Sequence, residues 1–139
     1  MKLILENKSK NSDQDYVSKK LTEYNQGFVK PDGYEKLNIF LKDDTGKILA
    51  GFLGGTYWGW LCIDFLWVDE SCRGKSYGSQ LLEAAEKEAV KRGCTNAHVD
   101  TIDFQAPEFY QKKGYQVCGK LEGLPKGHTR FLMRKDLVL

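Results

Sequence analysis

A strand, a short loop and a helix follow one another over residues 61–93, and this unit constrains the fold more than any other part of the 139-residue chain. The run from Leu61 to Val68 is rich in β-branched and aromatic residues, which predicts a largely buried strand. Its single acid, Asp64, must be functional or compensated there. Because Asp64 lies four residues before Val68, we expect it on the strand face that carries Leu66 and Val68.

The helix that follows runs from about Gly78 to Gly93. Leucines and alanines recur at the 3.6-residue period, and acids precede bases by four positions, which both favour a helix. Gly93 stands where a left-handed C-terminal cap is expected. A helix that starts after a loop of small residues points several backbone N–H groups and the positive end of its dipole at one spot. The loop therefore predicts a site for phosphate.

Two kinds of phosphate loop compete for residues 73–78. A Gly-Lys-Ser triplet here matches the end of a nucleoside-triphosphate loop, but that loop needs a glycine five positions before the triplet, where Asp69 stands. An acid there would repel a triphosphate. The second pattern is Gln or Arg, two residues, Gly, one residue, then Gly or Ala; Arg73, Ser76 and Gly78 meet it, with serine in the first glycine place. This loop resembles the pyrophosphate loop of the GNAT (Gcn-related N-acetyltransferase) family. The serine is expected to restrict how closely a diphosphate approaches.

Residues 103–115 resemble the later motif of the same family. In that motif a small residue, here Ala106, opens a short helix, a Phe-Tyr pair follows three residues on, and a glycine with an aromatic residue closes it. The local signals agree, because Pro107 suits a first helical turn, Lys112 a last turn and Gly114 a cap. Both motifs occur in the family's order, and the resemblance covers nearly the whole chain.

The remaining pattern predicts one domain over residues 1–139, with the order strand, helix, three strands, helix, strand, helix, two strands. This order resembles the GNAT-like acyl-CoA N-acyltransferase fold, a mixed α/β fold whose central, mostly antiparallel sheet is flanked by helices. Three glycines in the 47–57 strand imply a bulge or a close backbone approach. Outside the two motifs we expect a strand in the first seven residues, a helix over 13–26, and strands over 34–42, 47–57, 96–101, 115–120 and 129–134.

Net charge, cysteine content and the length of the apolar runs argue against several classes of protein. The chain has 21 basic and 19 acidic residues, a net charge of +2, which gives no support for nucleic-acid binding. Its four cysteines form no CxxC pair and it has two histidines, so we expect neither a zinc site nor a disulfide framework. No signal peptide opens the chain, and no apolar stretch approaches the ~20 residues that cross a membrane. We expect a cytoplasmic protein without a metal ion or a membrane partner.

Acetyl transfer from a thioester to an amine needs a neutral nucleophile and a proton for the departing thiolate. An alkyl ammonium has a pKa of roughly 10, so it must lose a proton on the enzyme. By resemblance to the polyamine acetyltransferases, Asp64 is the predicted base, acting directly or through a water; the alternative is a buried acid paired with an unseen Arg or Lys. Glu70 is a second candidate base, although a solvated or capping role suits it better. Tyr110 is the predicted general acid; its alternative role is a packed aromatic ring with the hydroxyl at the edge.

The resemblance also implies contacts with acetyl-CoA. The pantetheine arm is expected to pair with the backbone of the strand before the loop, and the pyrophosphate with N–H groups of the loop. Asp103 stands where the family often has an asparagine that touches the cofactor arm. Arg92 and Lys113 also fall beside the motifs, within expected reach of the phosphates. The cofactor-binding residues predicted in this way are Leu66, Trp67, Val68, Arg73, Gly74, Lys75, Ser76, Tyr77, Gly78, Ser79, Asp103, Ala106 and Lys112.

Tyr57, Trp58 and Trp60 lie between two central strands, near Asp64, and aromatic faces beside a carboxylate suit a cationic amine. Their alternative role is a core edge or a dimer interface. We expect an acetyl-CoA-dependent N-acetyltransferase that acts on a small cationic metabolite or drug by direct attack on the thioester, and, by resemblance, a homodimer. The alternatives are a non-catalytic acyl-CoA sensor, an enzyme for peptide or protein amines, and a structural protein whose aromatic hairpin is a partner surface.

Overall fold

The computed structural model describes residues 1–137 and divides into two compact units, residues 1–32 and the chain from residue 33 onward. Residues 1–7 form no strand, so the prediction of a first strand is wrong. A strand needs a partner for its backbone groups, and the apolar triplet Leu3 to Leu5 is exposed and unpaired in this part of the structure. Because the chain forms two compact units, one domain over residues 1–139 stays a prediction.

Helix α1 (Asn11–Asn25) belongs to the first unit and confirms the predicted helix within two residues at its start and one at its end. Its apolar face, formed by Tyr16, Val17, Leu21 and Tyr24, is 60 to 67% exposed, and none of its residues is buried. An isolated helix of this length is marginal in water. Helix α1 therefore gains little stability from burial inside its own unit.

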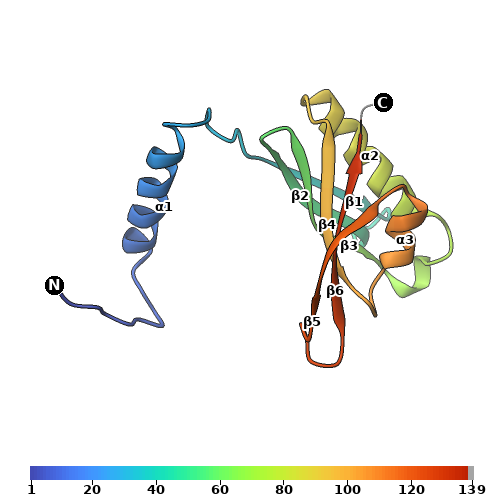
Figure 1. Cartoon of the computed structure of the whole chain (residues 1–139). Helices are drawn as coiled ribbons and strands as arrows, with labels where there is room; N and C mark the ends of the chain where they lie inside the picture. Colours follow the sequence, from blue (N-terminus) through green and yellow to red (C-terminus); the bar gives the residue numbers. More distant parts are fainter. Residues whose placement is uncertain (138–139) are drawn as a thin grey trace. The chain divides into compact units, whose positions relative to one another are not determined.

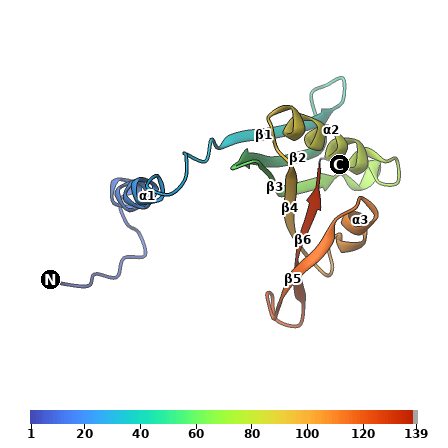
Figure 2. The same cartoon turned by 45° about the horizontal axis from the view of Figure 1, so that its top comes forward.

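The second unit is built on one six-stranded sheet with the order β1-β2-β3-β4-β6-β5 (Figures 1 and 2). Only the β3–β4 pair is parallel among the described strands; the other neighbours are antiparallel. This confirms the predicted mixed α/β architecture and its mostly antiparallel sheet. The strands are β1 (Glu35–Lys42), β2 (Ile48–Tyr57), β3 (Trp60–Val68), β4 (Asn96–Ile102), β5 (Gln116–Glu122) and β6 (Thr129–Asp136).

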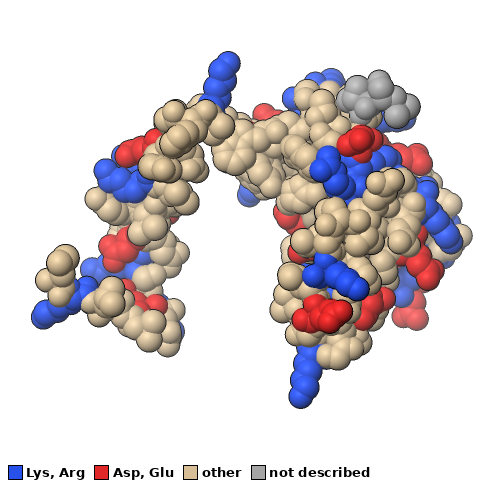
Figure 3. Space-filling view, in the orientation of Figure 1, with Lys and Arg blue, Asp and Glu red and all other residues tan. Residues whose placement is uncertain are grey.

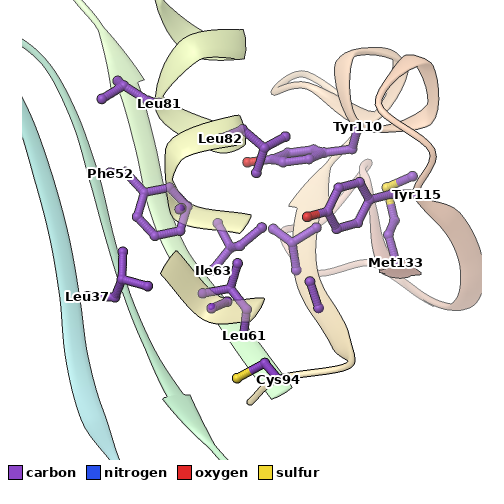
Figure 4. Close-up of a cluster of buried hydrophobic side chains, with 14 of the residues drawn as sticks. Leu37, Phe52, Leu61, Ile63, Leu81, Leu82, Cys94, Tyr110, Tyr115 and Met133 are labelled. Carbon is purple, nitrogen blue, oxygen red and sulfur yellow. The ribbon is translucent and has the colours of Figure 1, made fainter. Parts of the chain in front are cut away.

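Helices α2 (Tyr77–Lys91) and α3 (Pro107–Lys112) pack on one side of this sheet around a common apolar core. Figure 4 shows Leu82 of α2 beside Tyr110 of α3, with β-strand residues such as Ile63 beneath them. Both helices end as predicted. Gly93 and Gly114 have φ of 91° and 92°, and the next residue in each case donates its N–H to a carbonyl five positions earlier. The apolar spacing and Gly93 therefore located α2, and Pro107, the resemblance to the family motif and Gly114 located α3.

A β-bulge interrupts the β2–β3 pair, as the glycines of β2 indicated. Leu53 pairs with Phe65 and Gly54 with Ile63, so Asp64 is an extra residue without an opposite partner. A Cβ atom at Gly54 would overlap the carbonyl oxygen of Cys62, which shows how closely the two backbones approach there. The bulge reverses which residues face the core on either side of Asp64.

Strands β3 and β4 separate at this bulge. Their parallel pairing ends at Ile63 and Val99, while β3 stays paired with β2 as far as Val68 and β4 with β6 as far as Ile102. The facing edges of the two diverging strands are therefore open. This opening positions the cleft described below.

Candidate active site

A cleft of about 610 Å³ lies where β3 and β4 diverge. It is lined by residues from both strands, from the segment between β4 and α3, from α3 itself and from the loop before α2. Seven predicted site residues meet here, namely Asp64, Leu66, Trp67, Val68, Arg73, Ala106 and Tyr110; the other lining residues are Phe65, Val99, Asp100, Thr101, Phe104 and Gln105.

A second cavity of about 250 Å³ lies at the loop and shares Val68 and Arg73 with the cleft. Arg73, Gly74, Ser76, Tyr77, Gly78 and Ser79 line it, so most of the predicted pyrophosphate loop borders one space. The first N–H groups of α2 have no partners within the helix. A concave loop at the start of a 15-residue helix, with Arg73 at its edge, suits the negative charge of a phosphate group.

Ser76, in the first glycine place of the loop, occupies the left-handed region with φ 66° and ψ 16°. Gly74 has φ 79°. Ser76 is the N-cap residue of α2, yet its side chain makes no capping hydrogen bond. Serine therefore holds a backbone conformation that glycine adopts with less strain.

Asp64 is exposed at the inner end of the cleft, and its Oδ1 lies 3.5 Å from the Cys62 Sγ, which donates to it. Two expectations are corrected. Because of the bulge, Asp64 does not share a face with Leu66 and Val68, which pack against the core. It is also not a buried acid. Burial first, and then the Asp64 charge, raise the pKa of the Cys62 thiol to about 11, so this thiol is neutral and unsuited to act as a nucleophile.

Tyr110 borders the cleft while its ring is packed in the core, with 5% of the residue exposed. It contacts Phe109 and Tyr115 edge to face, at ring separations of 5.2 and 5.5 Å. Figure 4 shows the Tyr110 and Tyr115 rings side by side. Burial raises the pKa of Tyr110 to about 12. The packed ring agrees with the alternative role that the sequence left open, and the place on the cleft wall leaves the role of general acid a prediction.

Asp103 is held by the β5–β6 hairpin. Its Oδ2 accepts the Thr129 N–H at 2.9 Å, and its Oδ1 lies 2.8 Å from the His128 Nδ1. The Thr129 N–H and, less strongly, His128 keep the pKa of Asp103 below its ordinary value. Both carboxylate oxygens are therefore engaged, and Asp103 is not a side chain of the cleft wall.

Several basic residues expected to reach the phosphates lie outside the cleft and the loop cavity. Lys75 and Lys112 line neither cavity. Arg92 follows the last residue of α2, where it pairs with Glu88 and donates to two β1 carbonyls, so its expected reach to the phosphates is wrong. A helix of 15 residues separates it from the loop by roughly 22 Å. Lys113 pairs with Glu83 of α2 at 3.8 Å.

Tyr57, Trp58 and Trp60 surround the β2–β3 turn, where Trp58 and Gly59 both have positive φ. The Tyr57 hydroxyl lies 3.0 Å from the His98 Nε2, and the Arg134 guanidinium lies over the Trp60 ring at 4.9 Å. None of the three aromatic residues lines the cleft. Glu70, the alternative base, lies in the short 3₁₀ helix η1 (Glu70–Cys72), also outside the cleft wall.

Asp100, Thr101, Phe104 and Gln105 line the cleft but were not predicted as site residues. The sequence contains a partial signal for Asp100. Two strands joined by a helix favour a parallel pair, which would bring the acid of each strand, Asp64 and Asp100, close together. The sequence does not show that these two strands are neighbours, or in which register they pair.

Positive and negative side chains alternate over the surface of the second unit that Figure 3 shows, where Lys and Arg are interspersed with Asp and Glu. Within residues 1–137 no group of three His, Cys, Asp or Glu side chains converges as a metal ion requires. In the same residues no helix has the length and apolar character needed to span a bilayer.

Comparison with known proteins places these features in a family. The Acetyltransferase (GNAT) family model matches residues 4–115. The blasticidin-S acetyltransferase of Streptomyces morookaense is 41% identical over 95 residues, which cover 68% of this chain and 70% of that protein. An acetyltransferase of Agrobacterium fabrum is 34% identical over 83% of this chain and 84% of its own length. The crystal structure of an acetyltransferase from Bacillus cereus has a TM-score of 0.88 and 39% identity, covering 96% of this chain and 97% of that one.

Proposed function

This chain belongs to the GNAT family and is an acetyl-CoA-dependent N-acetyltransferase, and we propose that its acceptor is a small, positively charged primary amine. One observation carries the proposal: the exposed carboxylate of Asp64 stands at the inner end of a cleft that continues into the loop cavity. A cationic amine is attracted to such a carboxylate. The name of the Streptomyces relative, a blasticidin-S acetyltransferase, agrees with a small-molecule acceptor.

The open edge of β3 that faces β4 and the loop before α2 hold acetyl-CoA in this proposal. The backbone of residues 66–68 pairs with the extended pantetheine arm, and the N–H groups of residues 73–79 face the diphosphate. Arg73 adds a positive charge where the two cavities meet. Asp64 binds the ammonium group of the acceptor and takes one proton from it, directly or through a water.

The transfer is then a direct attack. The neutral amine nitrogen bonds to the thioester carbon as the C–S bond breaks; one ammonium proton leaves through Asp64 to solvent, and a second ends on the CoA sulfur. A covalent route through Cys62 is disfavoured because its thiol has a pKa of about 11.

Tyr110 acts on the departing sulfur. Its pKa is raised to about 12, whereas an alkyl thiol has a pKa of about 8.5, so complete proton transfer from the phenol costs about 5 kcal/mol. We therefore assign Tyr110 chiefly the role of hydrogen-bond donor to the developing thiolate, which receives the second amine proton by way of solvent. Hydrogen bonds to a charged group contribute about 1.5–3 kcal/mol.

A non-catalytic acyl-CoA sensor is the second candidate. It is favoured by two departures from the family pattern, the left-handed Ser76 in the loop and the engaged Asp103 carboxylate. The two candidates differ in whether CoA is released when an amine is added.

Calorimetric titration with acetyl-CoA tests cofactor binding, with CoA, ATP and NAD as comparison ligands. We expect micromolar binding of acetyl-CoA and CoA, and release of CoA when a cationic amine is present. Asp64→Asn is expected to lower turnover without changing acetyl-CoA affinity, whereas Asp44→Asn, in the β1–β2 turn, serves as the matched control. Absence of acetyl-CoA binding refutes the enzyme assignment, and loss of binding in Asp64→Asn refutes the role of base.

We also propose a homodimer. Phe40, Leu53, Phe65 and Trp67 are 37 to 69% exposed, and the register of β1, β2 and β3 brings them into neighbouring rows on one face of the sheet. Exposed apolar patches of this kind commonly mark interaction surfaces. Light scattering after size-exclusion chromatography distinguishes a dimer from a monomer of 15.9 kDa.

A further inference from the structure

Two carboxylates occupy equivalent positions at the inner end of the cleft. The last parallel pair of β3 and β4 is Ile63 with Val99, and the next residue on each strand is an aspartate, Asp64 and Asp100. Both side chains line the cleft. The charges of both also raise the pKa of the Cys62 thiol, after the larger effect of burial, so both lie near this one sulfur atom.

The negative charge of this pair is only partly balanced by the protein. Like charges on neighbouring strands repel each other. Asp64 accepts from the neutral Cys62 thiol, and Asp100 Oδ2 lies 3.7 Å from the Arg130 Nη1. The side chains of Arg130 and Asp100 are 29% and 48% exposed, and a long pair at such exposure contributes little.

The charges along the cleft are therefore asymmetric. Arg73, the basic residue of the cleft wall, lies at the far end, where its Nε donates to the carbonyl of Val68. The two aspartates lie at the opposite end, where β3 and β4 meet. A ligand with positive charge at the acidic end and phosphate at the basic end matches this arrangement.

We propose that Asp100 binds a second cationic group of the acceptor, an ammonium or a guanidinium, while Asp64 receives the amine that is acetylated. The inference rests on the proposed function and narrows its substrate class to diamines and related dications. Paired strands lie about 4.8 Å apart and these two diverge beyond the last pair, so the two cations need a spacer of roughly three to five methylene groups.

The test compares 1,4-diaminobutane with butylamine, which has the same carbon chain and one cation. Steady-state kinetics are measured with the full chain and saturating acetyl-CoA for the wild type and for Asp100→Asn, Asp100→Glu and the control Asp44→Asn. We expect the wild type to use the diamine with a kcat/KM about tenfold or more above that for butylamine. Asp100→Asn should remove this preference through a higher KM, and Asp100→Glu should restore part of it.

The readouts separate the inference from the function beneath it. Circular dichroism and unchanged acetyl-CoA affinity confirm that Asp100→Asn is folded, and its loss of kcat/KM should be larger for the diamine than for butylamine. Equal use of the two amines by the wild type, including use of neither, overturns the inference while acetyl-CoA binding still supports the proposed function. An equal loss for both amines in Asp100→Asn also overturns it, because a merely structural role predicts that result.

Discussion

Replacing Ser76 with glycine should stabilise the protein, although serine is the better N-cap residue in most helices. Ser76 makes no capping hydrogen bond, so the substitution removes none, and its φ of 66° is left-handed. That conformation costs an L-residue about 1–2 kcal/mol. Glycine also makes the unfolded chain more flexible, which lowers the stability of the folded state by about 0.4–1 kcal/mol. The difference leaves a net stabilisation of about 0.5–1 kcal/mol, which raises Tm by about 2–4 °C for a chain of this size.

The same substitution removes a side chain from the wall of the loop cavity, so acetyl-CoA should bind several times more tightly. Gly74→Ala is the matched opposite. Gly74 also has a positive φ, of 79°, and a Cβ atom there would meet nothing within 4 Å, so only backbone strain opposes alanine. We expect Gly74→Ala to destabilise by about 1 kcal/mol or more. Thermal unfolding and calorimetry measure both variants; a lower Tm for Ser76→Gly, or an unchanged affinity, would refute the reasoning.

Three further perturbations test other parts of the site and core. Tyr110→Phe should lower kcat about ten- to a hundredfold with an unchanged KM for acetyl-CoA, since it removes one hydrogen bond to developing charge; equal kcat values in steady-state kinetics would contradict this. The Thr129 N–H and His128 lower the pKa of Asp103 in the folded state. The ionised carboxylate therefore stabilises the protein at pH values above its unfolded pKa of about 3.9, and this contribution is lost as the pH falls through the lower folded pKa. Asp103→Asn should therefore have a lower Tm at pH 7, with the difference from wild type shrinking in acid; a pH-independent difference in thermal scans argues against it. Glu86 is 14% exposed and accepts hydrogen bonds from the side chains of Tyr115 and Lys135. Glu86→Ala should therefore lower the free energy of unfolding, measured in urea, by about 2–3 kcal/mol. A change near zero would show that these hydrogen bonds do not stabilise the protein.

Helices α2 and α3 could be predicted because their signals are local. The apolar spacing and Gly93 of α2, and Pro107 and Gly114 at the ends of α3, lie within a few residues of the helix that they predict. The expected strand over residues 1–7 failed for the opposite reason, since three apolar residues in a row do not supply a hydrogen-bonding partner. Asp100 was missed for a related reason. Its position beside Asp64 exists only once β4 pairs with β3, across a connection of more than 25 residues.

The position of Asp64 depends on a residue in another strand. Alternation along β3 put its side chain on the face of Leu66, yet the bulge opposite Gly54 makes it an extra residue and changes the face for everything that follows. Only glycine fits at Gly54, because a Cβ atom would overlap the Cys62 carbonyl oxygen. The parallel pairing with β4 ends at Ile63, the residue just before the bulge. A glycine in β2 thus fixes the local geometry in which β3 turns an acid toward the cleft, so the site depends on a pairing that no single segment encodes.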